Sequence, residues 1–335
     1  MSRHYEPKDF VILSERDYLG PNAHVSYATT RAFEDACVCQ GAKLLALSSR
    51  WRFANRILGK LHLRDFGYPK VTEQDGQCFL FVAMGIGNLR MAETLLRSLS
   101  KSHPVAIYMF DVWEPDFAEW ERLLNRINAS HLYFAYKAAA DHFARLRDGV
   151  HFLPQSMNEA VFHPHDCKKT RLFMQMGRRI EVFHKAVLHY MSAHEIPACD
   201  ENYIYEKERG QIIYPKFEEL SENISKTKFF ICAPRSFEET AAAGSCSDVT
   251  ARFYEAMACK TLIVGIKPDT FDLLFPSDAM IALAPDGSDF DEKIDYLLSN
   301  PTVYMDLIES NYRNVMANHR WTNRFNSIVD TINGQ

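Results

Sequence analysis

Residues 229–265 read FFICAPRSFEETAAAGSCSDVTARFYEAMACKTLIVG, and they contain the strongest fold signal in the chain. The stretch begins with a short apolar run, continues through a loop of small residues and a helical pattern, and ends in a second apolar run. Such runs, separated by a helix, predict parallel strands joined by a crossover helix. The same alternation recurs along the chain and predicts an α/β protein.

The alternation falls into two blocks of similar size. Strands are expected to begin at Phe10, Cys78, Val105, Leu132 and Val150 in the first block, and at Arg171, Ile212, Lys228, Thr261 and Met280 in the second. Helices at 27–43 and 50–60 are among those expected between them. The irregular stretch 154–170, PQSMNEAVFHPHDCKKT, indicates a connection. We therefore predict two Rossmann-like doubly wound domains, at 1–156 and at 157–318, and a helix at 319–335 that crosses back to the first domain.

Composition excludes several classes of function. The 335 residues are 47% hydrophobic and 24% charged, and the net charge is −5, so bulk nucleic-acid binding is not expected. The N-terminus lacks an apolar signal segment, and no run approaches the ~18 apolar residues of a membrane span, so we predict a cytoplasmic protein. The eight cysteines form no C-x-x-C pair, and no metal site is predicted.

The loop and helix at 241–258 carry a binding pattern. Small residues at 241–245 let backbone N–H groups approach a ligand, and Ser247 or Asp248 is placed to cap the helix. A helix start favours a phosphate, and Arg252 and Glu255 project from one helix face, although such pairs are also common on solvated helices. The binding residues expected here are Gly244, Ser245, Ser247, Asp248, Val249, Thr250, Arg252 and Glu255.

The stretch VTARFYEAMACKTLIVG, residues 249–265, resembles the donor-site helix and strand of retaining GT-B glycosyltransferases, whose two Rossmann-like domains face each other across a cleft. It is most similar to the spore-maturation (CgeB-like) branch. The resemblance implies that 1–156 is the acceptor-side domain and 157–318 the nucleotide-sugar-binding domain. It also implies that Glu255 binds the ribose hydroxyls and that Arg252 helps to hold the donor. The family's first paired acid would fall at Ser247, which leaves open whether Glu238 or Glu239 replaces it or whether both are loop charges.

A second segment agrees with this resemblance. RLFMQMGRRIEVFHKAV, residues 171–187, has an expected strand, then Gly177-Arg178-Arg179, then a helix with Lys185. In the same group a Gly-Arg and a following Lys supply the cations for the donor diphosphate, so Arg178, Arg179 and Lys185 are implied to take this role. Lys185 is equally well explained as a solvated helix residue.

The N-terminal half offers weaker candidates. Asp111 follows an expected strand and is placed to orient an acceptor hydroxyl, while Trp113 could stack on a sugar ring, and both are as well explained by structural roles. Asp17 and His24 lie in the loop after the first strand, where this enzyme class meets the acceptor and the donor sugar. Gly85-x-Gly87 lacks the third glycine of the dinucleotide fingerprint and indicates a turn.

These patterns predict a metal-independent glycosyltransferase that takes a nucleotide diphosphate sugar, most commonly a UDP-sugar, and an unidentified acceptor hydroxyl, with retention implied by the resemblance. Asp289 and Asp291 match the D-x-D of metal-dependent enzymes, but a capping box explains them. Two alternatives stay open: a UDP-sugar epimerase of the same architecture, and a non-catalytic nucleotide-sugar-binding protein.

Overall fold

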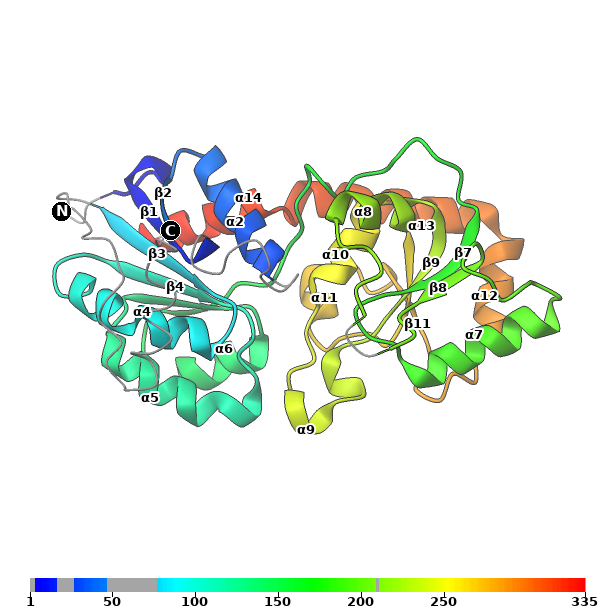
Figure 1. The fold of residues 1–335 in the computed structure, drawn as a ribbon, viewed down its shortest axis with the longest axis horizontal. Coiled ribbons are helices and arrows are strands. Elements are labelled where there is room, and N and C mark those ends of the chain that lie inside the picture. The colour runs from blue at the N-terminus through cyan, green and yellow to red at the C-terminus, as the bar shows by residue number, and fades with distance from the viewer. Residues whose placement is uncertain (1–3, 17–26, 47–76, 209–210, 335) are drawn as a thin grey trace. The chain divides into compact units, whose positions relative to one another are not determined.

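The computed structural model describes residues 4–16, 27–46, 77–208 and 211–334 (Figure 1). The helix expected at 50–60 and the residues Asp17 and His24 lie outside these ranges. The chain divides into two compact units, each built around its own parallel sheet. The first unit comprises Met1–Gln155, Ala241–Cys246 and Trp321–Gln335, and the second comprises Ser156–Thr240 and Ser247–Arg320.

The described part of the first unit contains a six-stranded parallel sheet with the order β2-β1-β3-β4-β5-β6. Its strands are β1 (Phe10–Ser14), β2 (Lys43–Ala46), β3 (Cys78–Ala83), β4 (Val105–Met109), β5 (His131–Phe134) and β6 (Val150–Phe152). Its helices include α2 (Tyr27–Cys39), α4 (Ile86–Leu99), α5 (Phe117–Ile127), α6 (Lys137–Ala144) and α14 (Trp321–Ile332). Short 3-10 helices lie at Pro7–Asp9 and Glu114–Asp116.

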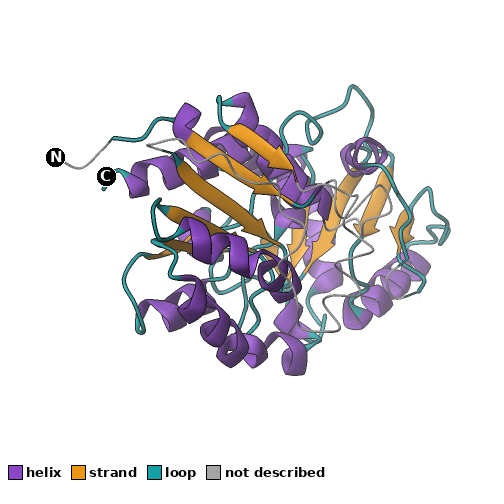
Figure 2. Ribbon diagram, turned by 60° about the vertical axis from the view of Figure 1, so that its left-hand side comes forward, coloured by secondary structure: helices purple, strands orange, loops and turns teal. Residues whose placement is uncertain are grey.

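Both faces of this sheet are buried, because successive side chains of a strand point to opposite sides. On β3, Phe79 belongs to the core that contains Trp120 of α5, whereas Leu80 belongs to the core that contains Phe33 of α2 and Trp321 of α14. Helices therefore cover both faces (Figure 2). The chain leaves β1 toward one face and leaves β3 toward the other, which makes the boundary between these strands the topological switch point.

The second unit contains a five-stranded parallel sheet with the order β11-β10-β9-β7-β8 in the described residues. Its strands are β7 (Arg171–Gln175), β8 (Tyr203–Tyr205), β9 (Thr227–Cys232), β10 (Leu262–Gly265) and β11 (Ile281–Ala282). Its helices include α7 (Glu181–Ala193), α8 (Phe217–Ser225), α10 (Ala251–Ala258), α11 (Phe271–Leu274), α12 (Phe290–Ser299) and α13 (Pro301–Asn318). The 3-10 turn Arg235–Phe237 and the short α9 (Thr240–Ala243) connect β9 to α10.

The second sheet has its own switch point between β7 and β9. Phe183 of α7 packs in the core on one face of the sheet, and Phe253 of α10 packs in the core on the other face. Residues that follow β7 and β9 consequently lie beside the switch point, beyond the carboxyl ends of these strands, which is where open α/β sheets bind ligands.

Two predicted elements were wrong. The helix expected at 27–43 ends at Cys39, because the chain turns at Gly41, whose φ of 104° favours glycine, and then enters β2. The candidate strand at 212–214 is not a strand, and β8 (Tyr203–Tyr205) takes the edge position instead. Both errors concern short edge strands, whose apolar patterns are the weakest.

Candidate functional site

The centre of the second unit's switch point is Gly177, two residues beyond β7. Its φ is 90°, a backbone conformation that favours glycine. Its N–H donates a 2.6 Å hydrogen bond to Oε1 of Glu206, which directly follows the neighbouring strand β8. A Cβ at Gly177 would lie 3.6 Å from Nε of Arg252, so the guanidinium group packs against this backbone. Residues from β7, β8 and α10 are thereby brought together.

Glu206 is a functional candidate that the sequence analysis missed. The residue is buried, which raises the pKa of its carboxyl, while the N–H of Gly177 and the nearby guanidinium groups of Arg252 and Arg178 act against this rise. Glu206 is the first charged residue after the apolar run YIY of β8. That signal was overlooked because the strand was expected at 212–214.

Arg252 and Glu255 form an ion pair on one face of α10. The side chain of Glu255 is only 4% exposed, and that of Arg252 is 28% exposed. The guanidinium group therefore holds a buried carboxylate and still reaches the surface beside Gly177. The carboxylate of Glu255 can accept hydrogen bonds from hydroxyl groups.

The cations after β7 lie among carboxylates of the same unit. Nε of Arg178 is 3.7 Å from Glu239, and Nε of Arg179 is 3.2 Å from Glu181. The guanidinium carbon of Arg179 also lies 5.9 Å from the ring centre of Tyr205. These half-buried cations lie beside carboxylates, and an anionic ligand can compete with those carboxylates for them.

Lys185 lies one turn into α7 and is exposed. The structure therefore places it on the helix that begins after Arg178 and Arg179. Its placement on this solvated surface agrees equally with both interpretations of the sequence.

The start of α7 is itself an anion site, and Glu238 occupies it. Oε1 of Glu238 accepts a 2.8 Å hydrogen bond from the N–H of Glu181, the first residue of the helix. Glu239 instead pairs with Arg235 at 2.7 Å. Glu238 and Glu239 thus bind groups that also bind phosphate oxygens. A carboxylate and a phosphate both carry the negative charge that the start of a helix favours.

The start of α10 differs from the prediction. Thr250 is the N-cap residue, and neither Ser247 nor Asp248 caps the helix, since the helix has no side-chain cap hydrogen bond. Oγ of Ser247 accepts a hydrogen bond from the N–H of Asp269, and the N–H of Val249 donates to Thr270. Asp248 is buried. The chain at 247–250 is therefore held by the loop after β10, which delays the helix start to Ala251.

The small-residue loop belongs to the first unit. Ser245 donates its N–H to Oε2 of Glu114 at 2.5 Å, which lowers the pKa of this exposed carboxyl. Gly244 has a φ of 61°, and a Cβ there would overlap the side chain of Glu114. Gly244 and Ser245 thus form a carboxylate-binding turn.

In the first unit, Asp111 follows β4 and accepts a hydrogen bond from the hydroxyl of Tyr136 at 3.4 Å. The ring of Trp113 lies 4.4 Å from the ring of Tyr136. These contacts give both residues a structural partner. Gly85 and Asn88 form the expected turn, in which the side chain of Asn88 accepts the N–H of Gly85 at 3.0 Å.

Within the described ranges, no group of three His, Cys, Asp or Glu residues is placed to hold a metal ion. The capping box expected at Asp289 does not form, although Asp289 is the N-cap residue of α12. Its carboxylate instead accepts the N–H of Ala284 and pairs with Lys293. Asp291 lies 3.9 Å from His189. The two aspartates of the D-x-D pattern therefore have separate partners.

Comparison with known proteins places these features in context. Residues 199–330 match the family described as glycosyl transferase-like, and this range contains Glu206, Arg252 and Glu255. No curated protein matches the sequence. The structure of HepE from Anabaena in complex with UDP and glucose superposes with a TM-score of 0.59 at 8% identity, covering 97% of this chain and 99% of HepE. The chain has the GT-B fold.

Other structures share the GT-B fold. A glycosyltransferase from Rickettsia africae covers 99% of both chains with a TM-score of 0.55 at 10% identity. The N-terminal domain of a Candida albicans trehalose-6-phosphate phosphatase gives 0.58 at 11% identity, covering 96% of both chains. A shared fold does not by itself define an activity, whereas the family match concerns residues 199–330 of the sequence. The family match over residues 199–330 and the shared fold together support a transferase. No helix in the described part is long and apolar enough to cross a bilayer.

Proposed function

We propose that the enzyme transfers a sugar from a nucleotide diphosphate sugar to an acceptor hydroxyl, with the donor held at the switch point of the second unit. The observation that carries the proposal is the guanidinium group of Arg252 beside the backbone of Gly177. The strand end and the helix face implied by the family resemblance are thereby adjacent in one unit, although 75 residues separate them.

The donor's diphosphate fits the cationic part of this site. Arg178, Arg179 and Arg252 offer guanidinium groups, and the start of α7 offers N–H groups, all of which bind phosphate oxygens well. Glu238 accepts the N–H of Glu181 at the start of α7, and Glu239 lies beside Arg178. A donor therefore exchanges with protein carboxylates as it binds.

Glu255 fits the donor's ribose. Its carboxylate is buried and is oriented by Arg252, so it presents a fixed acceptor to two neighbouring hydroxyl groups. UDP is the favoured nucleotide, because HepE, which shares the fold, was crystallised with UDP and with UDP-glucose. The similarity of residues 249–265 to the CgeB-like branch supports retention of the anomeric configuration.

Arg179, Lys185 and Arg252 are proposed to stabilise the departing diphosphate, where negative charge develops as the bond to the sugar breaks. Cationic side chains fixed near this position can replace the metal ion of other transferases. Asp111, Asp17 and His24 remain candidates on the acceptor side. The residues from Gly244 to Thr250 named above remain candidates for binding the donor.

A thermal-shift panel with UDP, GDP, ADP and dTDP tests the donor site. A ligand at 100 times its Kd adds about 2.7 kcal/mol to stability, so a bound nucleotide raises Tm by several degrees. We expect UDP to give the largest shift and UDP-sugars to be hydrolysed slowly without an acceptor. No shift with any nucleotide would overturn the proposal, whereas binding without hydrolysis or transfer would indicate a non-catalytic binding protein.

A further inference from the structure

The switch point of the first sheet contains a small polar pocket. Its lining comes from the end of β1, from α2, from β3 and from the start of α4: Glu15, Arg16, Tyr27, Thr30, Arg31, Glu34, Val82, Met84 and Asn88. Glu15 directly follows β1, and Asn88 lies in the first turn of the helix after β3. The pocket thus lies where the two chain directions diverge, the position at which open α/β sheets bind ligands.

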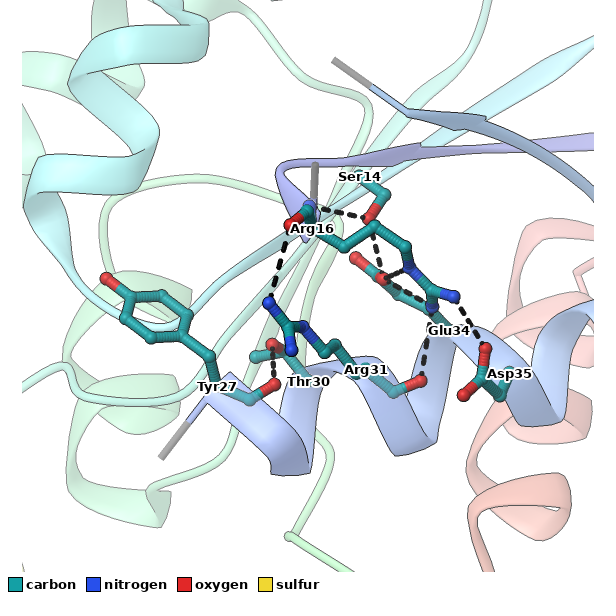
Figure 3. Close-up of polar contacts among 7 residues, drawn as sticks. All are labelled: Ser14, Arg16, Tyr27, Thr30, Arg31, Glu34 and Asp35. Carbon is teal, nitrogen blue, oxygen red and sulfur yellow. Dashed lines mark hydrogen bonds and ion pairs between the residues drawn. The ribbon is translucent and has the colours of Figure 1, made fainter. Parts of the chain in front are cut away.

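One side of the pocket is a closed network of charges (Figure 3). Oε2 of Glu34 accepts hydrogen bonds from Oγ of Ser14 at 2.7 Å and from Nε of Arg16 at 3.0 Å. Arg16 also donates to Asp35 at 2.8 Å, and Arg31 donates to the backbone oxygen of Arg16 at 3.4 Å. These contacts fix the wall of the pocket, and they leave Arg16 committed to Glu34 and Asp35.

Glu15 is different, because only one of its carboxyl oxygens is engaged. Oε2 accepts a 2.5 Å hydrogen bond from Nδ2 of Asn88, whose own oxygen accepts the N–H of Gly85. Oε1 is buried and has no hydrogen-bond partner among the described residues. The whole residue is 5% exposed. A buried polar atom left without a partner is costly, so this oxygen calls for a hydrogen-bonding partner such as a water molecule or a ligand hydroxyl group.

We propose that Oε1 of Glu15 binds a hydroxyl group of the sugar acceptor, an inference that rests on the proposed glycosyltransferase function. Because Oε2 is held by Asn88, the oxygen in the pocket carries the proton whenever the carboxyl is neutral. It then donates a hydrogen bond, and when the carboxyl is ionised it accepts one.

The chemistry of the pocket selects a hydroxyl group over charged ligands. Burial raises the pKa of Glu15 to about 8, with the nearby Glu34 adding to the rise and the hydrogen bond from Asn88 opposing it. Both protonation states of Glu15 are therefore populated near neutral pH. A hydroxyl group can donate and accept, so it suits both states, whereas an ammonium only donates and a carboxylate or phosphate only accepts.

The other polar groups around the pocket agree with this assignment. The hydroxyl of Tyr27 lies 3.5 Å from Nδ2 of Asn88 and can contact the same ligand. The charges of Arg16 and Glu34 are mutually neutralised. Arg31 donates a hydrogen bond to the backbone oxygen of Arg16 and keeps its positive charge at the edge of the pocket. A hydroxyl-bearing ligand can meet the carboxyl of Glu15 and the hydroxyl of Tyr27 together.

Saturation-transfer NMR on the full chain, without donor, tests the pocket directly. The probes are the methyl glycosides of glucose, galactose, mannose and N-acetylglucosamine, with glucosamine as the amine and gluconate as the carboxylate. We expect at least one methyl glycoside to bind, with a Kd that changes less than about 2-fold between about pH 6.5 and about pH 9.5, a range that brackets the Glu15 titration.

Two variants and one control assign the binding to Glu15. Glu15→Leu keeps the volume but removes both oxygens, so it should weaken the glycoside by about 10-fold, the loss expected for a buried hydrogen bond. Glu15→Gln keeps a polar atom facing the pocket and should weaken glycoside binding less than about 3-fold. Tyr108→Phe removes another buried hydroxyl of this unit, one bonded to the oxygen of Pro154, and should leave the Kd unchanged.

Any one of three results would overturn the inference. The first is that no methyl glycoside binds the wild-type chain. The second is that Glu15→Leu keeps its fold and binds the glycoside as tightly as the wild type does. The third is that glucosamine or gluconate binds more tightly than the glycosides, with the pH dependence of a charged pair. The result is separable from the donor proposal, because UDP binding is measured independently. A UDP shift with no glycoside binding removes the Glu15 subsite alone.

Discussion

The two sheets of this protein place carboxyl groups at equivalent positions, the switch points of their strand orders, but in opposite electrostatic surroundings. In the second unit, Glu255 pairs with Arg252, and Glu206 receives a backbone N–H beside two guanidinium groups. In the first unit, Glu15 receives one amide hydrogen bond, while the neighbouring Arg16 is committed to Glu34 and Asp35.

This difference shows that topology decides where a ligand binds and charge compensation decides which ligand is accepted. A carboxylate beside a cation is a partner that an incoming phosphate can replace. A buried carboxyl without a cation becomes neutral near physiological pH and suits an uncharged hydroxyl group. One chain thus provides an anion site and a neutral polar site by the same architectural rule.

The largest expected effect comes from removing the central cation of the second site. Arg252→Ala should weaken UDP binding by about 100-fold, because it removes a charged hydrogen-bond donor and leaves the buried carboxylate of Glu255 unpaired. Isothermal titration with UDP measures the change. Arg126→Ala, which breaks an exposed pair with Glu93 in the first unit, is the matched control and should leave the Kd unchanged. Equal affinities of both variants would remove Arg252 from the donor site.

The next effect tests the neutral state of Glu15. Its folded pKa of about 8 exceeds the ordinary 4.5, so the folded protein holds more protons between these values. Stability should therefore fall as pH rises through this window, by up to about 1.4 kcal/mol per pH unit, relative to Glu15→Gln, which does not titrate.

Urea unfolding at several pH values measures this difference for the wild type and for Glu15→Gln. Tyr108→Phe serves as the control, since it should shift stability by the same amount at every pH. A difference between wild type and Glu15→Gln that does not vary with pH would show that the folded carboxyl is ionised throughout, and the contrast between the two sites would fail.

A smaller effect concerns the backbone at the second switch point. Gly177→Ala introduces a Cβ at a φ of 90° and beside Arg252, which should cost about 1–2 kcal/mol of stability and lower the affinity for UDP. Gly87→Ala is the matched control, because it lies in α4 with open space around its Cβ and should stabilise the protein slightly. Calorimetry measures the stability and the UDP affinity of both variants. Equal changes in the two variants would contradict the close approach of Arg252.

The smallest effect separates the two carboxyl environments by pH. The pKa of Glu206 is raised by burial, so protonation at lower pH removes a negative charge beside Arg252 and Arg178. UDP should bind a few-fold more tightly at low pH than at high pH once the titration of the UDP phosphates is subtracted with Glu206→Gln. Glu206→Gln should bind UDP more tightly than wild type at the higher pH. An unchanged affinity there would place Glu206 outside the site.

Local sequence patterns were sufficient for much of the fold. The apolar runs at Phe10, Cys78, Val105 and Thr261 predicted strands, because a strand buried on both faces must be apolar along its length. The edge strands β2 and β8 were missed, since an edge strand packs less and carries a weaker pattern. The helix cap at Ser247 or Asp248 was predicted wrongly, because a contact with the distant loop residues Asp269 and Thr270 holds that segment.

The sequence alone determined the α/β class, the two-block arrangement and the pairing of Arg252 with Glu255, since all of these depend on spacing within one element or on simple alternation. Only the tertiary structure brought Glu206 to Gly177, Arg252 to the end of β7, and Asn88 to Glu15. These contacts join segments that are adjacent in a sheet but distant along the chain. The protonation of a carboxyl depends on burial and neighbouring charges, which exist only after those segments have packed.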